Sequence, residues 1–407
     1  MYKERHIDNL ICDIERMYGA VLIVGARQVG KTTYLERHTG LEKLSMDDRL
    51  TLSMAKEEPA TFLNTHAAPV FLDEIQKAPE LFSQIKYEID KDRSKKGLYY
   101  MTGSEQPKLM KESSESLSGR IGIAKLYGLS LREYFDVDFT PPFLPVSDYL
   151  DNRKYRIEPI AEDRLWYLIH RGSMPELLLN EDFRWDIYYS SYLDTYIERD
   201  IRGDIGNGNE MKFTSFLVSC AAMCGELLNM SALARDVGIS QPTAERWLTK
   251  LCETNVVYLL KPYFNNVKKR VVKTPKLYFT DTGLAAYLTK WNTPETLQNG
   301  AFGGQLFENF CVMEILKSYY NKSPSEPPVY FYRDSNQKEI DLIIQEGDVL
   351  HPLEIKKTAD PTRKQIAAFE ELDNIAGVER GTGGIICRRD KVSNITENDY
   401  VIPVEML

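Results

Sequence analysis

Short blocks of hydrophobic residues end in polar or glycine-containing segments at three places in the first third of the chain. Residues 21–24 (VLIV) precede a glycine-rich loop, residues 69–72 (PVFL) precede two acids, and residues 97–101 (GLYYM) precede Thr-Gly-Ser. Apolar runs of this length, rich in branched and aromatic residues and bounded by turn residues, predict buried strands. We therefore expect an α/β domain with a mainly parallel sheet over residues 1–140.

The loop after the first strand reads GARQVGKTT and has the glycine spacing of a phosphate-binding loop. Glycines let the backbone turn its N–H groups around a polyphosphate, and a helix beginning near Lys31 directs its positive end at the same anion. Lys31 is expected to reach the β- and γ-phosphates, and the Thr32 hydroxyl to ligate Mg²⁺. The predicted ATP-binding residues are Gly25, Ala26, Arg27, Gln28, Val29, Gly30, Lys31, Thr32 and Thr33.

The second and third strands end in residues that suit nucleotide hydrolysis. Asp73 is expected to hold Mg²⁺ through water, and the adjacent Glu74 to polarise the attacking water. Ser104, after the third strand, is a candidate contact of the γ-phosphate, although a plain turn explains it equally well. Arg120 is a candidate charge stabiliser for the transferring phosphoryl group, from this subunit or a neighbour, and an ordinary surface arginine is the competing interpretation.

The order of these motifs resembles that of the bacterial and archaeal AAA-like ATPases that carry an uncharacterised C-terminal domain. The resemblance extends over nearly the whole chain, through SMDDRL (45–50), LREYF (131–135), RGSMPELLL (171–179), YLDTYIERDI (192–201), LYFTDTGLAAYL (277–288) and GQLFENFCVMEIL (304–316). It implies an ATPase domain, a helical and winged-helix middle, and an α/β tail related to the restriction-type PD-(D/E)xK nucleases.

The middle of the chain changes from a proline-rich stretch to helical periodicity. Residues 141–160 hold four prolines and predict a linker, and 163–198 predict helices whose aromatic residues form a core. Residues 229–260 predict a helix-turn-helix, with Ser240 capping the second helix. Two β-rich runs follow as a wing. This wing (261–276) is a candidate contact for DNA or RNA, or else a packing or oligomer module, and it contains six basic residues and no acid: Lys261, Lys268, Lys269, Arg270, Lys273 and Lys276.

The tail contains two alternating runs, within residues 338–357, that flank Gly347-Asp348 and predict a two-residue type II′ hairpin. In that register Asp341 faces Glu354 and Glu339 faces Lys356 on one side, with an apolar face on the other. Opposed carboxylates lie roughly 5 Å apart and repel, so a compensating charge is expected, and a divalent metal would supply it.

The nuclease resemblance assigns roles to the same residues. It implies that Asp341 and Glu354 bind Mg²⁺, that Lys356 orients or activates the attacking water, and that Glu308 supplies an additional acid. A mixed-charge hairpin facing solvent is the alternative. Because such a fold can lose catalysis and keep nucleic-acid binding, the sequence leaves cleavage itself open.

The amino-acid composition excludes only a few classes of protein. The chain has 407 residues, 43% of them hydrophobic and 27% charged, with a net charge of −9, which excludes a generally basic coat for nucleic acid. The six cysteines are scattered, and only Cys220 and Cys224 lie close in the sequence, in an apolar run with no histidine nearby. This favours buried thiols over a metal site or a disulfide framework. The apolar runs are too short for a membrane span and the first residues do not form a secretory signal, so we expect a cytoplasmic protein without membrane contact.

Together these patterns predict three parts: an ATPase domain (1–140), a linker with helices and a winged helix (141–295), and a nuclease-like domain (296–407). The expected cofactors are ATP and Mg²⁺, and a homo-oligomer is one expected assembly. In one hypothesis nucleotide state is coupled to nucleic-acid binding or processing by the tail. In the other, the protein is an ATP-dependent switch that binds DNA or a protein partner and cuts nothing.

Overall fold

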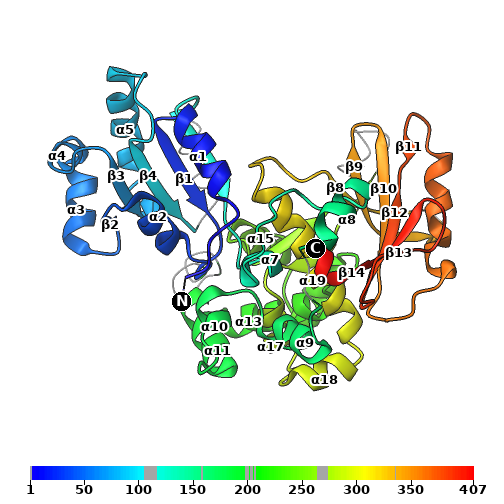
Figure 1. Cartoon of the computed structure of the whole chain (residues 1–407). Helices are drawn as coiled ribbons and strands as arrows, with labels where there is room; N and C mark the ends of the chain where they lie inside the picture. Colours follow the sequence, from blue (N-terminus) through cyan, green and yellow to red (C-terminus); the bar gives the residue numbers. More distant parts are fainter. Residues whose placement is uncertain are drawn as a thin grey trace.

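A computed structural model describes residues 2–104, 117–156, 159–197, 201, 205, 208–263, 274–334 and 336–407. Two sheets lie at opposite ends of the molecule, and a helical part lies between them (Figure 1). Within the described residues, no helix combines the length and apolar character needed to cross a membrane.

The N-terminal sheet has five strands in the order β2-β3-β4-β1-β5, and each neighbouring pair is parallel. This confirms the predicted α/β domain with a parallel sheet. The central strand β1 is buried on both faces, because Val21 and Ile23 join the core beneath α1 while Leu22 and Val24 join the core beneath α5. The elements are α1 (Asp8–Met17), β1 (Ala20–Val24), α2 (Lys31–Thr39), β2 (Lys43–Ser45), α3 (Arg49–Glu57), α4 (Pro59–Thr65), β3 (Val70–Asp73), the 3₁₀ helix η1 (Ile75–Lys77), α5 (Glu80–Lys91), β4 (Tyr99–Gly103) and β5 (Ile121–Lys125).

In the proline-rich stretch predicted as a linker, the described residues 141–156 pack against the end of the tail. The stretch contains α8, whose Tyr149 and Arg153 side chains donate to the carbonyl oxygens of Met406 (2.9 Å) and Glu405 (2.7 Å). Proline prevents a continuous helix, but it does not prevent extended chain from packing. This segment therefore fastens the end of the tail to the residues that follow the N-terminal sheet.

The helical part includes the two helices predicted for the helix-turn-helix. Gly238 ends α14 in the left-handed conformation (φ +69°), and the Ser240 side chain caps α15 by accepting from the Thr243 N–H. The assignment of this unit as a winged helix stays a prediction. The helices are α7 (Leu131–Tyr134), α8 (Ser147–Lys154), α9 (Glu162–Arg171), α10 (Pro175–Leu179), α11 (Trp185–Tyr196), α13 (Glu210–Ala222), α14 (Met230–Val237), α15 (Gln241–Glu253), α17 (Thr282–Leu288), α18 (Pro294–Asn299) and α19 (Gly303–Tyr320).

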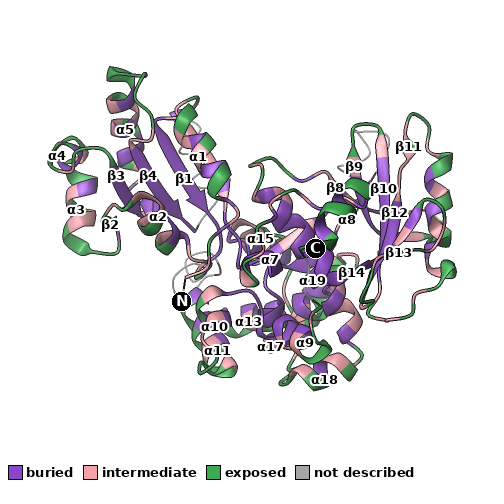
Figure 2. Cartoon of the chain, viewed as in Figure 1, coloured by how far each residue is buried: buried purple, intermediate pink, exposed green. Residues whose placement is uncertain are grey.

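The C-terminal sheet is mixed, in the order β13-β14-β12-β10-β9-β8 with β11 paired to β10. Helix α19 lies in the centre of the molecule and is buried along most of its length (Figure 2). The remaining elements are β6 (Val257–Leu260), which pairs antiparallel with β7 (Lys276–Phe279), then β8 (Val329–Arg333), β9 (Glu339–Glu346), β10 (Val349–Ile355), η3 (Arg363–Asn374), β11 (Glu379–Arg380), β12 (Gly383–Cys387), β13 (Ser393–Asn394), β14 (Asp399–Pro403) and η4 (Val404–Met406).

Candidate functional site

The glycine-rich loop connects the central strand β1 to helix α2, as the sequence predicted. Gly30 caps α2 with φ +93°, and a Cβ added to Gly25 would lie 2.1 Å from the Leu126 carbonyl oxygen. Both positions therefore require glycine. The Lys31 ammonium group folds over the loop and donates to the carbonyl oxygens of Gly25 (2.9 Å) and Ala26 (2.8 Å). The loop thus already holds the shape of an anion cradle, with the lysine at its centre.

The two residues expected to hold Mg²⁺ are in direct contact. The Thr32 hydroxyl donates to Asp73 Oδ1 at 2.8 Å, and the Thr102 hydroxyl donates to the same oxygen at 2.5 Å. Asp73 is 7% exposed at the end of β3, where the carboxyl ends of three neighbouring strands meet. A hydroxyl and a carboxylate in contact at this edge form the oxygen ligand set that Mg²⁺ prefers.

Glu74 and Ser104 are linked through a residue that the sequence did not single out. Glu74 adopts the left-handed conformation (φ +57°), and its N–H donates to the Thr102 hydroxyl at 3.1 Å. The Gln76 amide nitrogen contacts the Glu74 carboxylate and donates to Ser104 Oγ at 3.1 Å. Gln76 therefore orients the predicted base toward the same strand ends as Ser104, and only the folded geometry reveals this role.

Arg5 is a second residue that no motif indicated. Its guanidinium group donates to the carbonyl oxygens of Val29 (3.0 Å) and Tyr127 (2.6 Å), and Nε pairs with Glu133 at 3.1 Å. Arg5 is 6% exposed. It therefore clamps the phosphate-binding loop to the chain that leaves the sheet after β5.

A cleft of about 1040 Å³ opens in front of the loop and continues to the helical part. Its nucleotide side includes Lys31, Thr32 and Glu74, and the opposite wall comes from α10 and the residues after it, among them Pro175 and Phe183. A small-molecule site is usually a concave space of this size lined by a few polar groups. The cleft therefore lies between the N-terminal sheet and the helical part.

Arg120 does not lie at this cleft, which corrects its expected role within the same subunit. It precedes β5, and its carbonyl oxygen accepts from the N–H of Ala20, the first residue of β1. The loop follows the last residue of β1, at the opposite edge of the sheet and roughly 13 Å away at 3.3 Å per residue. The guanidinium group instead makes two bonds to Asp90, at 2.8 and 2.9 Å. Within one chain, Arg120 is therefore held at the end of the sheet away from the loop.

The tail hairpin has the predicted register. Val349 pairs with Glu346 and Leu353 with Leu342, and Gly347 in the turn has φ +63°. The charged face carries Asp341 and Glu354, as expected, and Lys356 bridges them. The Lys356 nitrogen is 2.8 Å from Asp341 Oδ2 and 2.7 Å from Glu354 Oε2. The positive charge of Lys356 therefore compensates the repulsion between the two carboxylates, a role that the sequence led us to expect of a metal ion.

Glu339 does not pair with Lys356, contrary to the simple extension of the hairpin. Its carboxylate contacts Lys276 at 2.6 Å and Arg333 at 2.8 Å. The reason is that Glu339 lies opposite Arg333 in the β8–β9 pair, while β10 ends at Ile355. Glu339 is therefore held on the β8 side of the cluster.

Glu308 projects from α19 into the same cluster, although it is 33 residues before Asp341 in the sequence. Tyr278 donates a hydrogen bond to Glu308 Oε1 at 2.7 Å, and the Lys276 nitrogen is 3.3 Å away. The structure thus brings Glu308, Asp341 and Glu354 to one region together with two lysines. In the described part of the chain, however, these three carboxylates are not all close together: one oxygen from each does not lie within 4.8 Å of the other two.

Burial and mutual repulsion shift the proton affinities of the cluster. Burial, followed by the charge of Asp341, raises the pKa of Glu354 to about 8 and that of Glu308 to about 7. Burial also acts to raise the pKa of Asp341, but the positive charges of Lys356 and Lys276 outweigh it, so this pKa is lowered. The cluster therefore holds carboxyl groups with separated proton affinities, a pattern that occurs at functional sites.

Two of the six basic residues predicted for the wing, Lys261 and Lys276, lie in the described part of the chain. Lys276 is 3% exposed and belongs to the carboxylate cluster, because β7 packs beside α19 and β9. Lys261 pairs with Glu326 at 2.7 Å. Neither side chain is thus a free phosphate contact. Lys268, Lys269, Arg270 and Lys273 lie outside the described residues.

Comparisons with known proteins identify the first part of the chain. A family model described as an AAA domain matches residues 18–135. Two models described as domains of unknown function, DUF8612 and DUF4143, match residues 162–295 and 303–407. Together with the parallel sheet and its loop, the first match shows a P-loop AAA-like ATPase domain.

Similar proteins from mycobacteria are uncharacterised. A protein of Mycobacterium tuberculosis and one of Mycobacterium bovis are each 28% identical over 348 residues, covering 84% of this chain and 71% of theirs. A Walker-type ATPase of Pyrococcus abyssi is similar at 15% identity with a TM-score of 0.46, covering 71% of this chain and 96% of its own. A STAND-type signal transduction ATPase of Pyrococcus horikoshii has 11% identity and a TM-score of 0.28, covering 78% and 47%.

Proposed function

We propose that this protein binds and hydrolyses ATP with Mg²⁺ and couples its nucleotide state to nucleic-acid binding or processing by the tail. The contact between Thr32 and Asp73, beside the loop that Lys31 spans, carries the first half of this proposal. Lys31 would move from the loop carbonyl oxygens to the β- and γ-phosphates, and the loop N–H groups would bind the same oxygens. Bound Mg²⁺ supplies charge neutralisation at the phosphates.

Glu74 is the proposed general base. Its position after Asp73 places a carboxylate at the strand edge where the γ-phosphate would lie, and Gln76 fixes its side chain. Thr102 holds both Asp73 and the Glu74 backbone, so these two acids keep a fixed relative orientation. Ser104 would report the γ-phosphate through Gln76. A general base that is positioned in this way can accept the proton of the attacking water.

Helix α19 is the proposed mechanical connection between the nucleotide loop and the tail. The carbonyl oxygen of Leu126 lies directly against Gly25 of the phosphate-binding loop. The chain continues from Leu126 to residues 129–131. There the Leu131 N–H donates to Glu314 at 2.6 Å and Lys317 donates to the Leu129 carbonyl oxygen at 2.9 Å. Since α19 also carries Glu308, a shift of this segment on ATP binding would reach the carboxylate cluster through a single rigid element.

In the tail, Asp341, Glu354 and Glu308 are the proposed Mg²⁺ ligands and Lys356 the residue that orients water. Their collection on one charged face, from α19, β9 and β10, supports this assignment. Metal binding would require Lys356 to withdraw from at least one carboxylate. Its 33% exposed side chain has solvent into which it can move.

The second candidate function is a switch that binds DNA or a protein partner without cleavage. The observation in its favour is that both lysines already pair with acids of the cluster, Lys356 with Asp341 and Glu354, and Lys276 with Glu308 and Glu339. Acids that are already paired with lysines have less need of a metal. This face would then be a binding surface.

A nuclease assay separates the two functions. Linear, supercoiled, branched and single-stranded DNA, and RNA, are incubated with Mg²⁺ or Mn²⁺ with and without ATP. Asp341→Ala is compared with Asp348→Ala, which alters an exposed acid in the turn of the same hairpin. Cleavage that is lost only in Asp341→Ala supports the ATP-linked nuclease. Intact ATP hydrolysis without cleavage of any substrate supports the switch, and absence of ATP hydrolysis contradicts both.

A further inference from the structure

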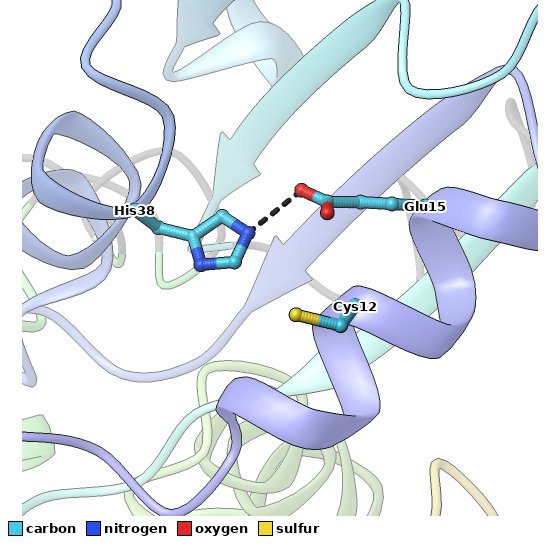
Figure 3. A group of neighbouring side chains, drawn as sticks. All are labelled: Cys12, Glu15 and His38. Carbon is cyan, nitrogen blue, oxygen red and sulfur yellow. Dashed lines mark hydrogen bonds and ion pairs between the residues drawn. The ribbon is translucent and has the colours of Figure 1, made fainter.

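Three potential metal ligands of different chemistry converge between α1 and α2. Cys12 and Glu15 are three residues apart and so lie on one face of α1, while His38 comes from the last turn of α2. One ligand atom from each lies within 4.8 Å of the other two. Figure 3 shows the His38 ring and the Cys12 sulfur directed into the same space, with the Glu15 carboxylate beside them.

The donor set distinguishes among metals. A thiolate, an imidazole nitrogen and a carboxylate oxygen are the three ligand types that proteins use for Zn²⁺, whereas Mg²⁺ and Ca²⁺ take oxygen ligands. Three protein ligands leave the fourth tetrahedral position for water. The group is half-buried, with the side chains of His38 and Glu15 exposed by 11% and 22%. An ion can therefore enter from solvent.

The histidine is already oriented for this role. His38 Nδ1 is 2.8 Å from Asp8 Oδ1, and the Tyr34 hydroxyl donates to the same oxygen at 2.9 Å. His38 Nε2 then faces Glu15 at 2.7 Å. In protein metal sites the imidazole nitrogen that does not bind the ion is commonly held by a carboxylate, which fixes the ring. Asp8 occupies that position here.

We propose that Cys12, Glu15 and His38 form a Zn²⁺ site, with Asp8 as the positioning residue. The site joins α1 to the far end of α2, the helix that begins at Lys31. Zn²⁺ would therefore cross-link the N-terminal helix to the helix that supports the phosphate-binding loop. The proposal uses none of the residues assigned to ATP hydrolysis or to the tail, so it stands apart from the proposed function.

Co²⁺ titration of the full chain tests the site, because Co²⁺ replaces Zn²⁺ in such sites and a cobalt–thiolate bond absorbs in the near ultraviolet. We expect this absorption to saturate at one Co²⁺ per chain, to persist in excess Mg²⁺, and to disappear when Zn²⁺ is added. It should be lost in Cys12→Ser and retained in Cys252→Ser, which removes the other half-buried thiol. No absorption in the natural chain, or equal absorption in Cys12→Ser, would overturn the proposal.

Two further measurements test the site even if Cys12→Ser fails to fold. Zn²⁺ should protect Cys12 from alkylation, read by mass spectrometry of the peptides, while Cys252 stays reactive. Asp8→Ala retains all three ligands and should weaken Zn²⁺ binding about 10- to 100-fold in a chelator competition. Alkylation of Cys12 that is unaffected by Zn²⁺ would contradict the site, and unchanged affinity in Asp8→Ala would remove the positioning role.

Discussion

At the scale of single residues, the proposed ATP binding depends most on Lys31. Its ammonium group lies over the loop and donates to the carbonyl oxygens of Gly25 and Ala26, the position from which it would reach a bound phosphate. Lys31→Ala should abolish ATP binding in titration calorimetry. The control is Lys56→Ala, an exposed lysine on α3. Unchanged affinity in Lys31→Ala would contradict the assignment of the loop.

Glu354 makes a residue-scale prediction about pH. Its folded-state pKa is about 8 against an ordinary value of 4.5, so between these pH values the folded chain binds more protons than the unfolded chain. The free energy of unfolding therefore falls as the pH rises through this window. Between about pH 6 and pH 9, the free energy of unfolding of the natural chain should fall by at least about 1 kcal/mol more than that of Glu354→Gln, because the glutamine amide stays neutral.

Urea unfolding with a chelator present measures this difference. Glu370→Gln, at an exposed acid of η3, is the control and should follow the natural chain. The charged groups that act on Glu354 are Asp341 and Lys356, and they are unchanged in both variants. Parallel pH profiles for the natural chain and Glu354→Gln would show that this carboxyl group titrates normally.

At the scale of elements, α19 depends on a buried ion pair. Glu314 and Lys317 are 2.8 Å apart with side chains 2% and 4% exposed, and each also bonds to the backbone of residues 129–131. Lys317→Met would leave the Glu314 carboxylate buried without its partner. We expect a loss of about 3–5 kcal/mol in the free energy of unfolding. Lys322→Met, just beyond the end of α19 and exposed, is the control, and equal unfolding midpoints would contradict the prediction.

The tail hairpin shows how far local pattern predicts an element. The turn residues and the alternation of apolar positions were sufficient for the register, because a one-residue slip would move the apolar face of β9 and β10 to the charged side. The partner of Lys356 was not predictable from the same pattern. It depends on where β10 ends and on the pairing of Glu339 with β8, which are contacts with other elements.

At the scale of the whole molecule, Arg120 can act on ATP only in an assembly. It lies at the sheet edge opposite the loop, so hydrolysis should be slow in isolated chains if a neighbour must supply it. We expect the ATPase rate per chain to rise with protein concentration and this rise to disappear in Arg120→Ala. Arg93→Ala removes another partner of Asp90 and serves as the control. A rate per chain that is independent of concentration would exclude the role.

Several features of the molecule depend on residues that are close together along the chain, and these could be predicted from the sequence. These are the phosphate-binding loop and its helix, the buried strands of the parallel sheet, the two acids at the end of β3, and the register of the tail hairpin. Each follows from spacing, turn chemistry and the period of apolar residues, which are local properties. The α/β ATPase domain was therefore predictable from the sequence alone.

The folded structure was needed to show which side chains from distant parts of the chain meet. It placed Arg5 and Gln76 at the nucleotide site, moved Lys276 from the wing to the carboxylate cluster, and put Arg120 at the wrong edge of the sheet for action on its own loop. It also brought His38 to Cys12. The physical reason is that charge pairing, burial and metal-ligand geometry depend on distances between elements, and strand order and helix packing fix these distances.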